Sequence, residues 1–219
     1  MDSIIYILFV AIFIPILLMT MLVEKKARLP IIFMLVGIFV SVFASEVNGV
    51  LVQVLPMSVY EVTVIVTPIS EELLKALPIL YYAMVISDKR EKLFTASMAT
   101  GIGFAVLENA YYLLNYGNFD MLGAIIRAFG AGLMHGMCTL LVGVGISFVK
   151  KKSKLFAVGT FGLLSTAIVY HGIYNILIQS EYVLIQSEYS IIGALLPIAT
   201  YIPFFIWRLR IKHRKSTTA

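Results

Sequence analysis

Ionisable and amide side chains recur inside the most apolar parts of this 219-residue sequence. They fall in the runs SEELLKALP, GIGFAVLENAYY, HGMCT and HGIYN, and they comprise Glu71, Glu72, Lys75, Glu108, His135, His171 and Asn175. A charged side chain inside a hydrocarbon layer is costly, so such residues persist where they pair, face a bundle interior or perform a function. Carboxylates, histidines, an amide and a lysine are together the groups that can activate water for attack on a carbonyl.

Two hydrolytic mechanisms suit this set of side chains. In the first, a glutamate acts as general base on a water molecule, and His and Asn donors stabilise the oxyanion. This mechanism requires no cofactor. In the second, a metal ion such as zinc activates the water, and Glu108, His135 and His171 are its candidate ligands. The sequence contains no H-E-x-x-H run, so no standard zincin helix supports the metal, and the choice between the two mechanisms stays open.

The spacing of these residues predicts that they meet at one depth of a helical bundle. Glu71 and Lys75 are four residues apart, as are His171 and Asn175, so each pair shares a helix face. With a rise of about 1.5 Å per residue, Glu71, Glu108, His135 and His171 fall within roughly 7 Å of one another in height. They lie between the midplane and the outer half of the membrane. Four helices thus each bring an ionisable group to one layer.

Composition supplies the helices that this arrangement needs. The chain is 60% hydrophobic and 13% charged, with a mean hydropathy of +0.96, whereas soluble domains carry about a quarter charged residues. Seven apolar segments are long enough to be considered as spanning helices, at about 3–23, 30–54, 58–86, 93–116, 122–149, 155–178 and 189–207. They show no strand-like alternation. We therefore predict an all-α polytopic bundle of about seven transmembrane helices, one membrane domain over 1–219 with a catalytic core at about 58–178.

The basic residues predict the orientation of this bundle. In a seven-helix arrangement, 15 of the 17 Lys and Arg residues fall in alternate loops and the C-terminal tail, all on one side. By the positive-inside rule the N-terminus then lies outside and the C-terminus in the cytoplasm. The net charge of +5 is explained by this topology, and the sequence has no nucleic-acid-binding motif.

The four polar runs, in this order on consecutive helices, resemble the PrsW family of intramembrane proteases. That family is related to a wider group containing CAAX prenyl endopeptidases and bacteriocin-immunity-type proteins. The resemblance covers roughly residues 68–176. It implies a bacterial plasma-membrane protease that makes the first cut in a single-pass membrane protein, such as an anti-sigma factor, on the outer side.

The resemblance also implies roles for individual residues. Glu71 corresponds to the water-activating base, Glu72 and Lys75 support it, and His171 with Asn175 stabilises the oxyanion. The wider group usually has a histidine where this chain has Glu108, and an arginine one residue later than Lys75. These departures leave open the role of Glu108, as co-base or water ligand, and that of His135.

Two other functions compete with the protease. Intramembrane Glu and His residues also build proton relays, so a proton- or cation-coupled transporter is the alternative. Transporters often contain inverted repeats, and no convincing repeat relates the two halves of this chain. A noncatalytic immunity or scaffold protein with the same fold is the third possibility.

Overall fold

The computed structural model describes residues 3–115, 121–149, 153–179, 195–203 and 205–206, and every regular element among them is helical. The α-helices are α1 (Ser3–Leu22), α2 (Lys25–Val54), α3 (Val59–Glu61), α4 (Thr67–Tyr81), α5 (Arg90–Asn115), α6 (Met121–Ile146) and α7 (Ser153–Gln179). Two π-helical segments, η1 (Val62–Val66) and η2 (Tyr82–Ile86), flank α4. The predicted all-α fold is confirmed for the described residues.

The helices follow the predicted segments closely. Elements α3 to η2 form one uninterrupted helical rod that corresponds to the segment predicted at 58–86. Helix α2 begins at Lys25, earlier than predicted, and continues unbroken through Glu46 and Asn48 to Val54. In the last predicted segment, residues 195–203 are helical, and the preceding residues lie outside the described part. The orientation of the two termini stays a prediction.

Four of the described helices are long and apolar enough to cross a bilayer by length and composition. Their candidate spans are Ile4–Leu22, Lys25–Val54, Gly123–Ile146 and Lys154–Ile178. The remaining long helices are α4 and α5, and these two carry the glutamates Glu71, Glu72 and Glu108. Glu71, Glu72 and Glu108 are therefore carried by the long helices that are least apolar.

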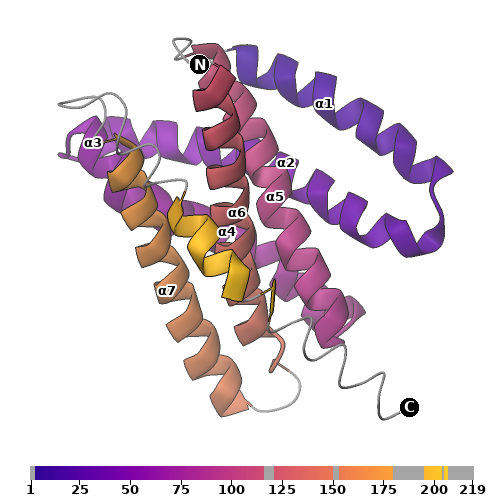
Figure 1. Ribbon diagram of the computed structural model, residues 1–219. Coiled ribbons are helices and arrows are strands. Elements are labelled where there is room, and N and C mark those ends of the chain that lie inside the picture. The colour runs from indigo at the N-terminus through magenta and orange to yellow at the C-terminus, as the bar shows by residue number, and fades with distance from the viewer. Residues whose placement is uncertain (1–2, 116–120, 150–152, 180–194, 204, 207–219) are drawn as a thin grey trace.

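Helix α6 lies in the middle of the bundle, between α5 and α7, while α1 packs along α2 and α5 at one side (Figure 1). The central core joins buried residues of α4, α5, α6 and α7, among them Ile79, Leu93, Met134 and Ala167. In contrast, only 6% of the candidate span in α1 is buried. The protein interior that can hold polar groups away from lipid is therefore formed by α2 and α4 to α7.

Glycines allow α5 and α6 to approach until their backbones touch. A Cβ atom added at Gly101 would overlap the backbone carbonyl oxygen of His135. A Cβ at Gly132, three residues before His135 on α6, would meet nothing within 4 Å. Close approach at Gly101 thus fixes the position of the α6 turn that carries His135.

We expect Gly101→Ala to destabilise the protein by about 1–3 kcal/mol, because the added methyl group meets backbone that cannot rotate away. Gly132→Ala is the matched control on the neighbouring helix. It should be neutral or stabilising by up to about 1 kcal/mol, since alanine favours a helix over glycine. Thermal unfolding in detergent, followed by circular dichroism, measures both. Equal stability of the two variants would contradict the close approach.

Candidate active site

Helix α4 places two glutamates and a lysine in the bundle interior. Its first residues, Thr67 and Pro68, follow η1 directly within the continuous helical rod, and Pro68 donates no backbone hydrogen bond at this junction. One turn later the chain presents Glu71, Glu72 and Lys75, whose exposed fractions are 5%, 0% and 0%. Buried charges at this depth require partners, and each of the three has at least one.

Lys75 pairs with Glu72 rather than with Glu71. The Nζ atom of Lys75 lies 2.6 Å from Oε1 of Glu72, three residues earlier on the same helix. It also lies 2.8 Å from Nδ1 of His135 and 4.5 Å from the ring centre of Phe104. The lysine therefore connects the α4 carboxylate with the α6 histidine.

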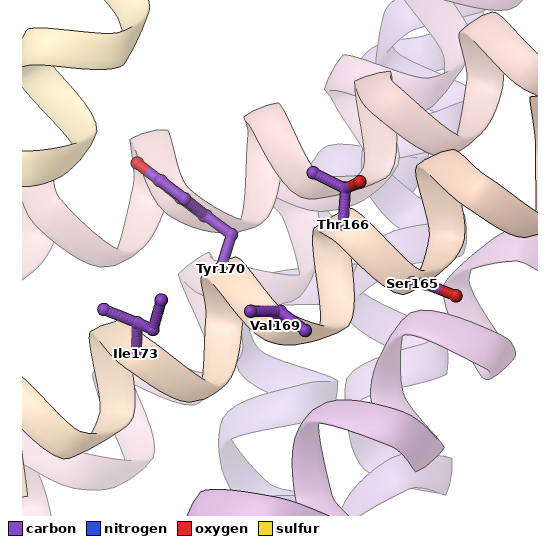
Figure 2. Close-up of a pocket in the computed structure, with 5 residues that line it drawn as sticks. All are labelled: Ser165, Thr166, Val169, Tyr170 and Ile173. Carbon is purple, nitrogen blue, oxygen red and sulfur yellow. The ribbon is translucent and has the colours of Figure 1, made fainter.

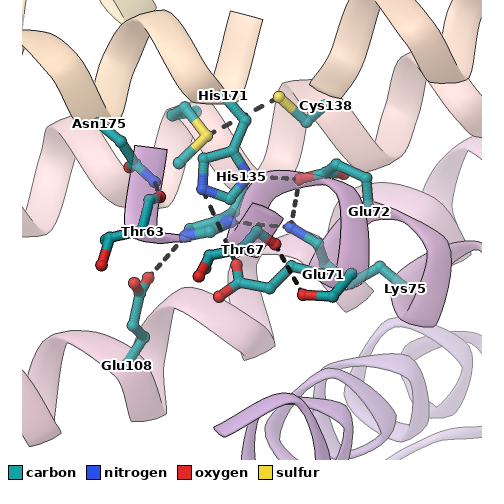
Figure 3. A network of polar contacts seen from close by, with 12 residues as sticks. Thr63, Thr67, Glu71, Glu72, Lys75, Glu108, His135, Cys138, His171 and Asn175 are labelled. Carbon is teal, nitrogen blue, oxygen red and sulfur yellow. Dashed lines mark hydrogen bonds and ion pairs between the residues drawn. The ribbon is translucent and has the colours of Figure 1, made fainter. Parts of the chain in front are cut away.

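His171, on α7, is held between the two α4 glutamates (Figure 3). Its Nδ1 atom lies 2.9 Å from Oε1 of Glu72, and its Nε2 atom lies 3.8 Å from Oε2 of Glu71. An ionised carboxylate only accepts hydrogen bonds, so Nδ1 carries the proton that is donated to Glu72. In that tautomer the lone pair of Nε2 points toward Glu71.

His135 continues the network to α5. The Lys75 ammonium can only donate, so Nδ1 of His135 accepts from it and Nε2 carries the proton. Nε2 then donates to Oε2 of Glu108, at 2.6 Å. The Glu108 side chain is 21% exposed, so it marks the more open edge of the cluster. The rings of His135 and His171 meet edge to face, with their centres 4.8 Å apart.

The two oxygens of the Glu71 carboxylate have different surroundings, as do those of Glu72, whose Oε2 is also buried without a hydrogen-bond partner in the part of the chain that the structure describes. Oε1 of Glu71 accepts a hydrogen bond of 3.1 Å from the Asn48 side chain of α2. Oε2 of Glu71 is buried and, among the described residues, has no hydrogen-bond partner. This oxygen faces His171 and is the one carboxylate atom of Glu71 left for a ligand or water.

Asn175 lies at the outer margin of the network. Its Nδ2 atom donates to the backbone carbonyl oxygen of Thr63 in η1, at 3.1 Å. One turn earlier on α7, Gly172 allows the two backbones to approach, because a Cβ there would lie 3.1 Å from the Val64 carbonyl oxygen. Asn175 thus ties α7 to the rod that carries the glutamates, and its role toward an oxyanion stays a prediction.

Asn48 is the residue of this site that the sequence reasoning missed. In the sequence, Glu46, Asn48 and Gly49 interrupt an otherwise apolar segment, which predicts a helix that ends early or bends. The available signal was the same one that singled out the other residues, namely a polar side chain inside a long apolar helix. A helical period cannot say which neighbouring helix such a side chain meets, so Asn48 was not assigned to the site.

A separate groove lies on the exposed side of α7 (Figure 2). Its volume is about 440 Å³, and it is lined by Ser165, Thr166, Val169, Tyr170 and Ile173. The Tyr170 hydroxyl lies 2.8 Å from that of Thr200, which links α7 to the helical residues 195–203. None of the predicted site residues lines this groove, so the groove and the polar network are distinct.

The polar network contains a donor set that fits a zinc ion. Glu71, His135 and His171 each offer one ligand atom, and these atoms lie within 4.8 Å of one another. Two histidines and one glutamate form a known set of catalytic zinc ligands. A histidine that binds zinc usually donates its other ring N–H to a carboxylate, as His171 does to Glu72. The predicted ligand set contained Glu108, whereas the set in the structure contains Glu71 in its place. Glu108 instead contacts His135. His135 can ligate only by giving up a present partner.

Membrane helices that bring carboxylates and histidines into one buried layer form a site that can activate water for hydrolysis. Residues 25–207 of the chain match the PrsW family intramembrane metalloproteases, and the chain belongs to this family. Helix α1 precedes the matched region. The protein is therefore an intramembrane protease. No curated protein and no solved structure matches the chain.

Proposed function

We propose that the protein cleaves a single-pass membrane protein, such as an anti-sigma factor, by means of a water molecule activated by Glu71. The observation that carries this proposal is the free Oε2 atom of Glu71, buried and directed at His171 Nε2 at 3.8 Å. A carboxylate oxygen without a protein partner is available to accept a proton from water. The Nε2 lone pair of His171 is placed to accept a hydrogen bond from the attacking water.

The remaining residues support this chemistry by their contacts. Glu72 fixes the tautomer and ring orientation of His171 through Nδ1. Lys75 balances the charge of Glu72 and orients His135, whose second nitrogen holds Glu108. These buried groups are organised before the substrate arrives, so little reorganisation accompanies charge development in the transition state.

A bound zinc ion would lie among Glu71, His135 and His171, where it would polarise the carbonyl and increase the acidity of the water. Glu71 is essential in either case, as base or as ligand.

The location of the cut follows from the predicted topology. The four-helix polar layer is predicted to lie from the midplane into the outer half of a bilayer, and the charge distribution predicts that the N-terminus lies outside. A site at this depth suits a first cut on the outer side of a bacterial plasma membrane. A prenyl-protein endopeptidase would need access from the cytoplasm, which fits this depth less well.

The test is a cleavage assay with the protein purified in detergent and a panel of single-pass substrates resembling anti-sigma factors. We expect one or more substrates to be cut near the outer membrane boundary, with the position read by mass spectrometry of the fragments. With Glu71 as the base, cleavage should persist in a strong chelator. Loss in chelator with recovery in zinc would place Glu71 in a metal shell and overturn its role as the base.

A further inference from the structure

Asn48 joins α2 to the first turns of α4 through both ends of its side-chain amide. Nδ2 donates to Oε1 of Glu71 at 3.1 Å, and Oδ1 accepts from the Ser70 hydroxyl at 2.5 Å. Ser70 and Glu71 are adjacent in the chain, so the two hydrogen bonds close a ring between the helices. The exposed amide of Gln53, further along α2, takes no part in this ring.

The Glu71 carboxylate determines which way the Asn48 amide points. An amide presents an acceptor at one end and two donors at the other, and its orientation follows from its hydrogen-bond partners. The carboxylate of Glu71 can only accept, while the Ser70 hydroxyl can donate. Oδ1 therefore faces Ser70 and the NH₂ group faces Glu71. The Ser70 hydroxyl, which also lies 2.9 Å from the Thr67 carbonyl oxygen, is compatible with the orientation that Glu71 requires.

Without Asn48, Glu71 would have a competing partner. Lys75 lies four residues after Glu71 on α4, at the spacing where opposite charges attract across a helix turn. In the structure Lys75 is instead bound by Glu72 and His135. The Asn48 hydrogen bond holds Oε1 on the α2 side, and this leaves Oε2 directed at His171.

We propose that Asn48 is a positioning residue that holds the Glu71 carboxylate in its reactive orientation, with Ser70 supporting the other end of the Asn48 amide. The proposal rests on the proposed function of Glu71. Removing an outer hydrogen-bond partner of a catalytic group commonly lowers activity by about 10- to 100-fold. Since Asn48 acts on orientation and touches no substrate, the loss should appear in kcat and leave KM unchanged.

The test compares Asn48→Ala, Asn48→Asp, Ser70→Ala and Gln53→Ala in the cleavage assay, with Glu71→Gln as reference. Asn48→Asp keeps the shape and the acceptor for Ser70 but offers Glu71 no donor when ionised. We expect Asn48→Ala and Asn48→Asp each to lower kcat about 10- to 100-fold, with Ser70→Ala intermediate and Gln53→Ala unchanged. Thermal unfolding of each variant separates this loss from loss of folded protein.

Three results would overturn the proposal, each in a different way. Wild-type kcat in Asn48→Ala, with Glu71→Gln inactive, would refute the positioning role and leave the proposed function intact. Wild-type kcat in Asn48→Asp would show that only the shape of the side chain matters. Full cleavage by Glu71→Gln would remove the proposed base, and the role of Asn48 with it.

Discussion

Replacing Glu71 with glutamine is expected to lower kcat for substrate cleavage by about 100- to 10,000-fold, the range typical for loss of a general base. Glutamine keeps the size of the side chain and its acceptor for the Asn48 amide. It removes the basic oxygen that faces His171 at 3.8 Å. Since Oε2 of Glu71 has no protein hydrogen-bond partner among the described residues, the substitution breaks no internal contact at that atom.

The measurement is a single-turnover cleavage assay with a substrate that the wild-type protein cuts, together with thermal unfolding of both proteins. Glu24→Gln is the matched control, because Glu24 is exposed and makes no side-chain capping hydrogen bond at the start of α2. The control should cut at the wild-type rate. A Glu71→Gln protein that is folded and cuts at more than a tenth of the wild-type rate would rule out Glu71 as the base.

Much of this site follows from spacing and depth alone. Helical periodicity placed Glu71, Glu108, His135 and His171 in one layer, and the structure brings them into one network of contacts. The reason is physical. In so apolar a chain, ionisable groups avoid lipid only by meeting in the bundle interior, so helices that carry such groups at equal depth bring them together.

The partners within that layer were less predictable. Spacing makes Lys75 a possible partner of Glu71 or Glu72, and the structure selects Glu72 because His135 and His171 approach from that side. His171 and Asn175 share a face as predicted, yet Asn175 bonds the Thr63 backbone. A helix period fixes which residues share a face, whereas the partner depends on the rotation of the neighbouring helices.

Local departures of the backbone from α-helical geometry could not be predicted from the sequence either. The segment predicted as one helix at 58–86 contains two π-helical parts, η1 and η2, on either side of α4. A π-helical turn shifts the register of the residues that follow it, and such turns are common at functional sites. No residue type in VTVIV signals this geometry. The rotation of α4, and so the direction of its glutamates, could not be derived from an ideal period.

Lys75→Met should produce the largest loss of stability, about 3–5 kcal/mol, because it leaves the Glu72 carboxylate buried without its cation. Glu72 and Lys75 are both fully buried, and their charged atoms lie 2.6 Å apart. Methionine fills a similar volume, so the expected loss reflects the unpaired charge rather than a cavity. Denaturant unfolding in mixed detergent measures it, with Lys89→Met as an exposed control.

The double variant Glu72→Gln/Lys75→Met separates charge from packing. Removing both charges also removes the cost of burying them, so the double variant should recover most of the stability that Lys75→Met loses. It should still cleave poorly, because a neutral glutamine at position 72 orients His171 less strongly and His135 has lost its lysine donor. Stability that stays as low in the double variant as in Lys75→Met would contradict the unpaired Glu72 carboxylate as the cause of the loss.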